Sequence, residues 1–221
     1  MISSMRTAIL AGATGLIGSY LLQRLLADSR YGKVIALSRR AIHASHPKLE
    51  VQAVSLDTLK DVAPTLRGDD WFCALGTTIK QAGSQEAFLR VDYEYPMALG
   101  EQAAATGAKQ FLIVSAAGAS PTSKIFYSRV KGEVERDLGK LELPRLHIFR
   151  PSLLLGEREK HRSGEKAWGV LMRGVNPLLL GSLRKYRAIH GDTVAEAMIR
   201  VANGTFEPGV HIHDGIGMSG R

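Results

Sequence analysis

Three glycines at three-residue spacing constrain the fold of this chain more than any other feature. They are Gly12, Gly15 and Gly18, and they follow the short apolar run of residues 7–11. After them, apolar residues recur at four-residue spacing, as on one face of a helix: Ile17, Leu21 and Leu25, with Leu22 and Leu26 beside them. The stretch therefore predicts a strand, a tight turn and an amphipathic helix.

This glycine spacing is typical of a turn that holds the diphosphate of a dinucleotide. Gly12 permits the sharp turn, Gly15 lets a pyrophosphate approach the backbone, and Gly18 lets the helix lie close to the sheet. The free amides and the positive end of the helix dipole attract phosphate. The predicted contacts are Gly12, Ala13, Thr14, Gly15, Leu16, Ile17 and Gly18. The alternative is a glycine turn with a purely structural purpose.

Two arginines after the second predicted strand, residues 33–38, indicate which dinucleotide is bound. Ser38, Arg39 and Arg40 stand where folds that select NAD place an acid on the ribose 2′-hydroxyl. Guanidinium groups suit a 2′-phosphate, which a carboxylate would repel. We therefore expect NADP(H) in preference to NAD(H). The alternative is that both arginines are merely solvated.

Strands alternate with helices along most of the chain. Further strands are predicted at residues 49–54, 70–75, 110–115 and 145–150, and helical segments at 84–106, where Pro96 splits the block or marks a first turn, and 124–138. This pattern predicts an α/β fold, a Rossmann-type doubly wound parallel sheet, in one NAD(P)-binding domain over residues 1–221. Leu75 ends the fourth strand, Gly76 and Thr77 follow it, and all three are expected to contact the cofactor in the crevice where such sheets bind ligands.

Composition limits the partners and the compartment. The 221 residues include one cysteine, Cys73, in an apolar run, so we expect a small core residue and no intrachain disulfide. With no signal-peptide pattern and no apolar run of membrane-spanning length, a cytoplasmic location is expected. The net charge of +8 favours an anionic partner such as a phosphate-rich cofactor. Because the basic residues are dispersed, a nucleic-acid-binding module is only a minor alternative.

Ser115, Tyr127 and Lys131 are candidate catalytic residues. Tyr127 and Lys131 are four positions apart, which places them on one helical face about 6 Å apart along the axis, and Ser115 ends the fifth strand. A phenol serves as a base at neutral pH only if its pKa is lowered, and a nearby ammonium does this. Ser115 would bind the substrate oxygen, Tyr127 would exchange its proton, and Lys131 would bind the nicotinamide ribose. Taken singly, each residue is better explained by a structural role: packing for Tyr127, solvation for Lys131 and capping of a loop for Ser115.

Together these motifs resemble the short-chain dehydrogenase/reductase superfamily, in its atypical or extended branch. The narrower resemblance is to the oxidoreductases related to the Tat-interacting protein, and it covers nearly the whole chain. It is carried by the glycine motif, Ser115, Tyr127-x-x-x-Lys131, the segments 75–78, 91–92 and 130–135, and Phe149-Arg150-Pro151-Ser152-Leu153-Leu154-Leu155-Gly156.

The resemblance implies an NADP(H)-dependent oxidoreductase that acts on a small carbonyl or alcohol. It implies that Ser115, Tyr127 and Lys131 are catalytic and that Pro151, Ser152, Leu153 and Leu154 contact the nicotinamide. Extended members commonly carry Asn where this chain has Asp92, which puts a potential charge near the cofactor. Because the branch also includes regulators, a cofactor-binding regulatory or redox-sensing protein without turnover is the alternative. A homodimer through the helices near residues 95–105 and 124–138 follows by analogy with the fold.

The carboxyl-terminal third offers weaker signals. Residues 152–190 are expected to form a small lid on the substrate side, and the charged residues 157–166 either clamp an anionic substrate or form a solvated loop. Thr193 and Glu196 form a capping-box pattern before a helix, with Asp192 as an alternative cap. His211 and His213 share one face of a last strand, with no third metal ligand evident, and His190 is expected to pack or hydrogen-bond.

Overall fold

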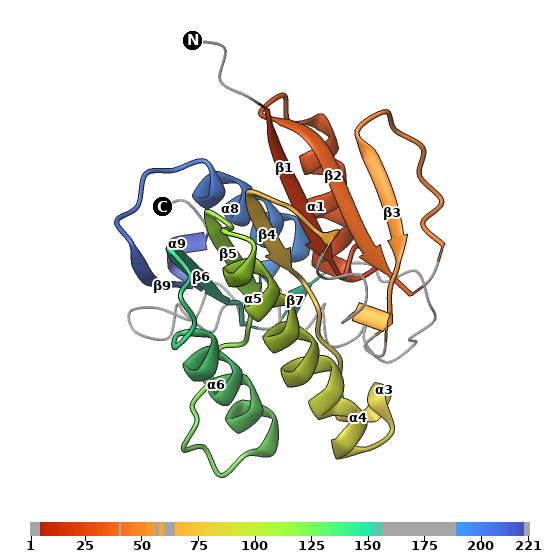
Figure 1. The fold of residues 1–221 in the computed structure, drawn as a ribbon. Helices are drawn as coiled ribbons and strands as arrows, with labels where there is room; N and C mark the ends of the chain where they lie inside the picture. The colour runs from red at the N-terminus through yellow and green to blue at the C-terminus, as the bar shows by residue number, and fades with distance from the viewer. Residues whose placement is uncertain are drawn as a thin grey trace.

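A seven-stranded parallel sheet forms the centre of the computed structural model (Figure 1), which describes residues 5–39, 41–55, 58–59, 65–152, 154–155 and 189–218. The strand order is β3-β2-β1-β4-β5-β6-β9, and every neighbouring pair is parallel. The strands are β1 (Arg6–Ala11), β2 (Tyr31–Ser38), β3 (Leu49–Ala53), β4 (Asp70–Cys73), β5 (Gln110–Val114), β6 (Arg145–Arg150) and β9 (Gly209–Asp214). The predicted doubly wound fold is confirmed.

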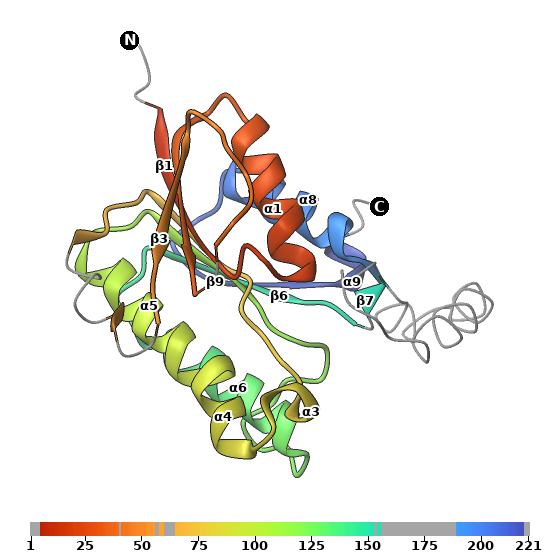
Figure 2. The same cartoon turned by 90° about the vertical axis from the view of Figure 1, so that its right-hand side faces the viewer.

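Helices cover both faces of this sheet (Figure 2). On one face lie α1 (Leu16–Ala27) and α8 (Gly191–Ala202), packed on one apolar cluster; on the other lie α5 (Tyr95–Ala105) and α6 (Phe126–Leu138), packed on a second cluster. Because both faces are buried, the central strands are continuous apolar runs rather than alternating ones. Cys73 lies in the second cluster, as expected of a small core residue.

The strand order reverses at β1, whose two neighbours are β2 and β4. In open parallel sheets, ligands bind beyond the carboxyl ends of the strands at such a reversal. The segments that follow β1 and β4 are the glycine turn and residues 74–78, and because these strands are parallel neighbours, both segments lie side by side at this edge of the sheet.

The block between β4 and β5 is more broken than the sequence indicates. It contains α3 (Ile79–Ala82), α4 (Gln85–Leu89), a π-helical turn η2 (Arg90–Glu94) and then α5. Pro96 lies in the first turn of α5, one of the two alternatives that the sequence left open, because a proline there loses no helical hydrogen bond. The π turn leaves no recognisable sequence pattern.

The predicted cap of α8 is wrong. The helix begins at Gly191, before the expected start, so Thr193 lies inside its first turn. The cap is His190, whose Nδ1 accepts a hydrogen bond from the Asp192 amide at 3.3 Å. The Asp192 carboxylate instead pairs with Arg24 of α1 at 2.7 Å, which joins the two helices on this face.

Two short elements complete the described chain. β7 (Leu154–Leu155) pairs in parallel with β8 (Ile189–His190), and α9 (Gly215–Met218) follows β9. Arg40, Leu153 and most of the expected lid, residues 156–188, lie outside the described residues. None of the helices in the described part of the chain has the length and apolar character needed to cross a lipid bilayer.

Candidate active site

The glycine turn has the tight geometry that its sequence predicts. Gly12 has a φ of +91°, and a Cβ built on it would lie 2.6 Å from the carbonyl oxygen of Ala74. A Cβ on Gly18 would collide with the carbonyl group of Gly12, and one on Gly15 would lie 3.2 Å from the same oxygen. Each position therefore excludes a side chain because backbone approaches it closely, and the turn packs against the segment that follows β4.

The first turn of α1 is left open for an anion. Its N-cap is Gly15, no side chain of the described residues caps it, and its first turn carries no acid. The amides of such a turn have no intrahelical partner, and together with the helix dipole they bind phosphate. Residues 12–18 thus fit the diphosphate of a dinucleotide, since the cradle is one that a Cβ would fill.

Arg39 is exposed directly after β2, so its guanidinium lies in solvent at the carboxyl edge of the sheet. Ser38, the last residue of β2, is half-buried. This is the edge where the 2′ position of a bound adenosine ribose is expected. The placement fits the predicted role of Arg39, and Arg40 lies outside the described residues.

The hydroxyl of Ser115 binds a glutamate on α6, a partner that the sequence did not indicate. The Ser115 hydroxyl is buried and donates to Oε1 of Glu135, which also accepts from Nε of Arg150 at 3.1 Å. Glu135 is eight residues after Tyr127 on α6, which is about 12 Å along the helix. Ser115 therefore holds a buried carboxylate, and to bind a substrate oxygen it would have to leave that partner.

Lys131 forms a buried ion pair with Asp92. Its Nζ lies 2.7 Å from Oδ1 of Asp92, and both side chains are almost fully buried. The other carboxylate oxygen accepts a hydrogen bond from the Thr77 amide at 2.9 Å. Gly76 covers the pair, since a Cβ there would lie 3.5 Å from Asp92 and 3.8 Å from Lys131. The pair thus lies directly beneath the segment after β4 that was predicted to line the cofactor crevice.

Tyr127 is half-buried one turn before Lys131, with its ring 5.7 Å from that of Phe88. Its pKa is raised: burial has the largest effect, the Lys131 ammonium lowers it, and the Asp92 carboxylate raises it. The expected lowering of the phenol's pKa is therefore absent from this protein without cofactor. The main reason is burial of the phenol, and Asp92 adds to it by offsetting part of the effect of the Lys131 charge.

Asp92 is the site residue that the sequence least explains. It belongs to η2, and π turns frequently occur at functional sites because they re-aim a side chain. The sequence signal was a single departure, an acid where the extended branch commonly has asparagine. Nothing local in the sequence indicated that Lys131 would be its partner.

The predicted contacts after β6 are placed only in part. Pro151 is buried, and its carbonyl oxygen accepts from the Ala117 amide at 2.9 Å, which joins this segment to the loop after β5. Ser152 is half-buried and Leu154 belongs to β7. These residues lie beyond the carboxyl end of β6, at the same edge of the sheet as the glycine turn.

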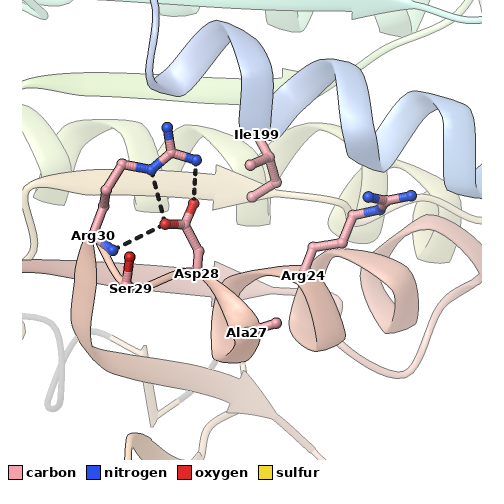
Figure 3. A pocket seen from close by; sticks show the side chains of 6 residues that line it. All are labelled: Arg24, Ala27, Asp28, Ser29, Arg30 and Ile199. Atoms are coloured by element: carbon pink, nitrogen blue, oxygen red, sulfur yellow. Dashed lines mark hydrogen bonds and ion pairs between the residues drawn. The ribbon is translucent and has the colours of Figure 1, made fainter.

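A hollow of about 570 Å³ lies away from these residues (Figure 3). It is lined by Arg24, Ala27, Asp28, Ser29, Arg30 and Ile199, at the carboxyl end of α1 and beside α8. The α1 helix separates it from the glycine turn by about 18 Å. Arg30 is held there by Asp28 through two hydrogen bonds of 2.7 and 2.8 Å. Because the hollow lies at the opposite end of α1 from the glycine turn, it is not the expected cofactor site.

Three histidines gather on β6 and β9. Nδ1 of His147 lies 3.2 Å from Nε2 of His213, and the rings of His147 and His211 are stacked with centroids 5.0 Å apart. No group of three or more His, Cys, Asp or Glu side chains in the described ranges has the arrangement needed to hold a metal ion.

Comparisons with known proteins agree with this geometry. Residues 12–140 match the family described as NAD(P)H-binding. Protein HTATIP2 of Rattus norvegicus is 36% identical over 164 residues, which cover 72% of this chain and 67% of that protein. Mitochondrial protein FMP52 of Eremothecium gossypii is 39% identical over 202 residues, which cover 88% of each chain. Both likenesses extend beyond the glycine turn to most of the sequence.

Solved structures share the fold at low sequence identity. MoeE5 in complex with UDP-glucuronic acid and NAD has a TM-score of 0.71 and 18% identity, covering 93% of this chain and 75% of that one. UDP-glucose 4-epimerase from Thermotoga maritima, with UDP-glucose, has a TM-score of 0.69 and 16% identity, covering 94% of this chain and 76% of that one. At this identity the likeness shows the fold alone.

The FMP52 relatives also correct the expected location. Several of them are named as mitochondrial proteins, which contradicts the cytoplasmic assignment. That assignment rested on the absence of a recognisable targeting pattern.

Proposed function

We propose that this chain, which belongs to the NAD(P)H-binding family of HTATIP2 and FMP52 within the atypical short-chain dehydrogenase/reductase superfamily, is an NADP(H)-dependent oxidoreductase of a small carbonyl or alcohol. The observation that carries the proposal is that the expected diphosphate site and the candidate catalytic side chains lie at the same edge of the sheet. There the open amino end of α1 faces the same crevice as the Asp92–Lys131 pair, and Tyr127 lies one helical turn from that pair.

The cofactor would lie across this crevice. Residues 12–18 would hold its diphosphate, and Arg39 would contact the 2′-phosphate that distinguishes NADP(H) from NAD(H). Gly76 and Thr77 would border the ribose beside them. Lys131, buried and charged, would donate to a ribose hydroxyl near the nicotinamide. When bound, the reduced dinucleotide supplies the hydride.

Tyr127 would provide the proton. In the reducing direction its phenol donates to the carbonyl oxygen of the substrate as the carbonyl carbon accepts the hydride, and solvent then restores the proton. In the oxidising direction the phenolate would take the proton of the alcohol. Ser115 would support Glu135 rather than touch the substrate, which leaves orientation of the substrate oxygen to Tyr127.

The direct test compares the parent protein with Tyr127→Phe. Calorimetry should show NADPH binding within about twofold in both proteins, since the missing hydroxyl does not contact the diphosphate. A panel of carbonyl compounds should show NADPH consumption by the parent and a loss of at least about 100-fold in the variant, the usual contribution of a general acid. Equal turnover by both proteins would refute the role of Tyr127.

A cofactor-binding regulator without turnover is the second candidate function. It is favoured by the engagement of Ser115 with Glu135, which removes a hydroxyl that an enzyme of this type would use. This candidate predicts NADPH binding with no NADPH consumption by the parent on the same panel, and a binding partner whose affinity changes with NADPH. Both candidate functions are compatible with a homodimer that forms through α5 and α6, and light scattering measures the mass that tests for it.

A further inference from the structure

Asp92 is held in place from three directions. Lys131 of α6 pairs with one of its oxygens at 2.7 Å, the Thr77 amide donates to the other at 2.9 Å, and the backbone of Gly76 covers both charges. Asp92 itself is fully buried. A carboxylate in such a position is costly unless it is paired, and the ammonium of Lys131 compensates this buried charge.

The ion pair with Asp92 changes the effect of Lys131 on the pKa of Tyr127. Burial is the largest single effect on the pKa of Lys131 and lowers it, but the Asp92 carboxylate, together with Tyr127 and Cys73, outweighs burial and the pKa is raised, so the ammonium stays charged. A charged ammonium alone would favour the phenolate of Tyr127. With a carboxylate in contact, part of this effect is offset at the phenol, and the cost of burying a phenolate is the largest contribution.

The other titratable groups around Tyr127 and Lys131 do not offset this effect. Cys73 of β4 faces Lys131, and burial raises the pKa of its thiol to about 11, so it is neutral at physiological pH. Glu135 lies one turn further along α6 and is held by Arg150. Asp92 is therefore the acid that acts on Tyr127 and Lys131 together.

We infer that Asp92 is a positioning residue that, by pairing with Lys131, disfavours the phenolate of Tyr127, so that the site serves carbonyl reduction and leaves alcohol oxidation to alkaline pH. The inference rests on the proposed function. Reduction uses the phenol: its O–H bond breaks, the proton goes to the substrate oxygen, and the carbonyl carbon takes the hydride of NADPH, which is oxidised. Oxidation needs the phenolate, which is scarce when Asp92 is charged.

The test measures Tyr127 directly, with neither cofactor nor substrate. Protein labelled with ¹³C at the tyrosine ring carbon that bears the hydroxyl is titrated by NMR, and the Tyr127 signal is assigned by its absence from Tyr127→Phe. We expect Asp92→Asn to lower the pKa of Tyr127 by at least about one unit, because the amide keeps a contact with Lys131 but carries no charge. Glu94→Gln, which removes an exposed acid of the same π turn, should leave the pKa of Tyr127 unchanged.

A pKa of Tyr127 that stays the same in Asp92→Asn overturns the inference. If that variant does not fold, the double variant Asp92→Asn with Lys131→Met removes both charges at once. The inference then expects the pKa of Tyr127 not to fall, because the ammonium that favours the phenolate is removed together with the carboxylate. A drop of about one unit or more in the double variant would overturn it.

Turnover separates this inference from the proposed function. At neutral pH, Asp92→Asn should raise the oxidation rate about tenfold for each unit by which the pKa of Tyr127 falls, and should move the alkaline fall of the reduction rate to lower pH by the same amount. If Tyr127 responds in the NMR titration but no carbonyl or alcohol is turned over, the proposed enzyme is wrong and the role of Asp92 in holding the proton stands. If the reaction rates of Asp92→Asn change but the pKa of Tyr127 does not, the inference is refuted and the proposed function is unaffected.

Discussion

Replacing His147 should make the protein less sensitive to mild acid. His147 is fully buried in β6, its ring stacks on that of His211, and its Nε2 has no hydrogen-bond partner among the described residues. Burial, followed by the neighbouring His213 and His211, lowers its pKa to about 3. An imidazole that must stay neutral in the folded chain, but accepts a proton near pH 6.5 when unfolded, makes folding depend on pH.

The sign and size of the change in folding stability with pH follow from the pKa of His147 in the folded chain and in the unfolded chain. Below pH 6.5 the unfolded chain binds a proton at this position and the folded chain does not, until the pH reaches about 3. The contribution of His147 is therefore complete above pH 6.5 and is lost as the pH falls, by about 1.4 kcal/mol per unit. Between pH 7 and pH 5 the loss is about 2 kcal/mol. The pKa of His213 is also lowered by burial and adds loss of the same sign.

Urea unfolding of the parent and of His147→Leu at pH 7 and pH 5 measures this contribution. Leucine fills a similar volume and removes the unpartnered Nε2, and the loss of the His147–His213 hydrogen bond affects the variant at both pH values. Going from pH 7 to pH 5, the parent should lose about 2 kcal/mol more than the variant, since contributions from carboxylates cancel in the comparison. His43→Leu, which removes an exposed histidine, should behave as the parent does. Equal losses in the parent and His147→Leu would refute the reasoning.

Three further predictions concern the cofactor and the thiol. Arg39→Ala should weaken NADPH binding about tenfold and leave NADH binding unchanged, because only NADPH carries the phosphate that the guanidinium would pair with; equal affinities of the parent for both would contradict this. Gly18→Ala should abolish dinucleotide binding in calorimetry, since its methyl would collide with Gly12, whereas Gly139→Ala at the exposed end of α6, whose Cβ would have only ordinary contacts, should bind normally. Cys73, with its pKa raised to about 11 by burial, should react with a thiol reagent at pH 8 only after unfolding; rapid reaction of the native protein would contradict its burial.

The sheet and its helices could be predicted because their signals are local. A glycine turn, apolar runs and helical spacing each lie within a dozen residues, and the alternation of strands with helices is sufficient to predict a parallel sheet. The edges of elements were less predictable. The cap of α8 depends on where the helix begins, and only the structure shows that it begins at Gly191 and is capped by His190.

The chemistry of the site depends on partners that are distant in sequence. Tyr127 and Lys131 were found from their spacing, but Asp92 reaches Lys131 from a π turn on another element, and Glu135 takes the hydroxyl of Ser115. No periodicity relates such pairs, because they are set by how the helices dock on the sheet. The partner of Ser115 could not be predicted for this reason: strand-end position predicted where Ser115 lies but not which group it binds.

One face of α6 explains how the site is organised. Tyr127, Lys131 and Glu135 follow each other at intervals of four residues, so the helix presents three polar groups in a row along the sheet. Asp92 pairs with Lys131, and Arg150 pairs with Glu135, so both buried charges are compensated. Among the described residues, no hydrogen bond engages the Tyr127 hydroxyl, which lies at the end of the row nearest the crevice. The two lower pairs fix the helix against the sheet, and that arrangement leaves one hydroxyl for the substrate, with a protonation state that depends on Asp92.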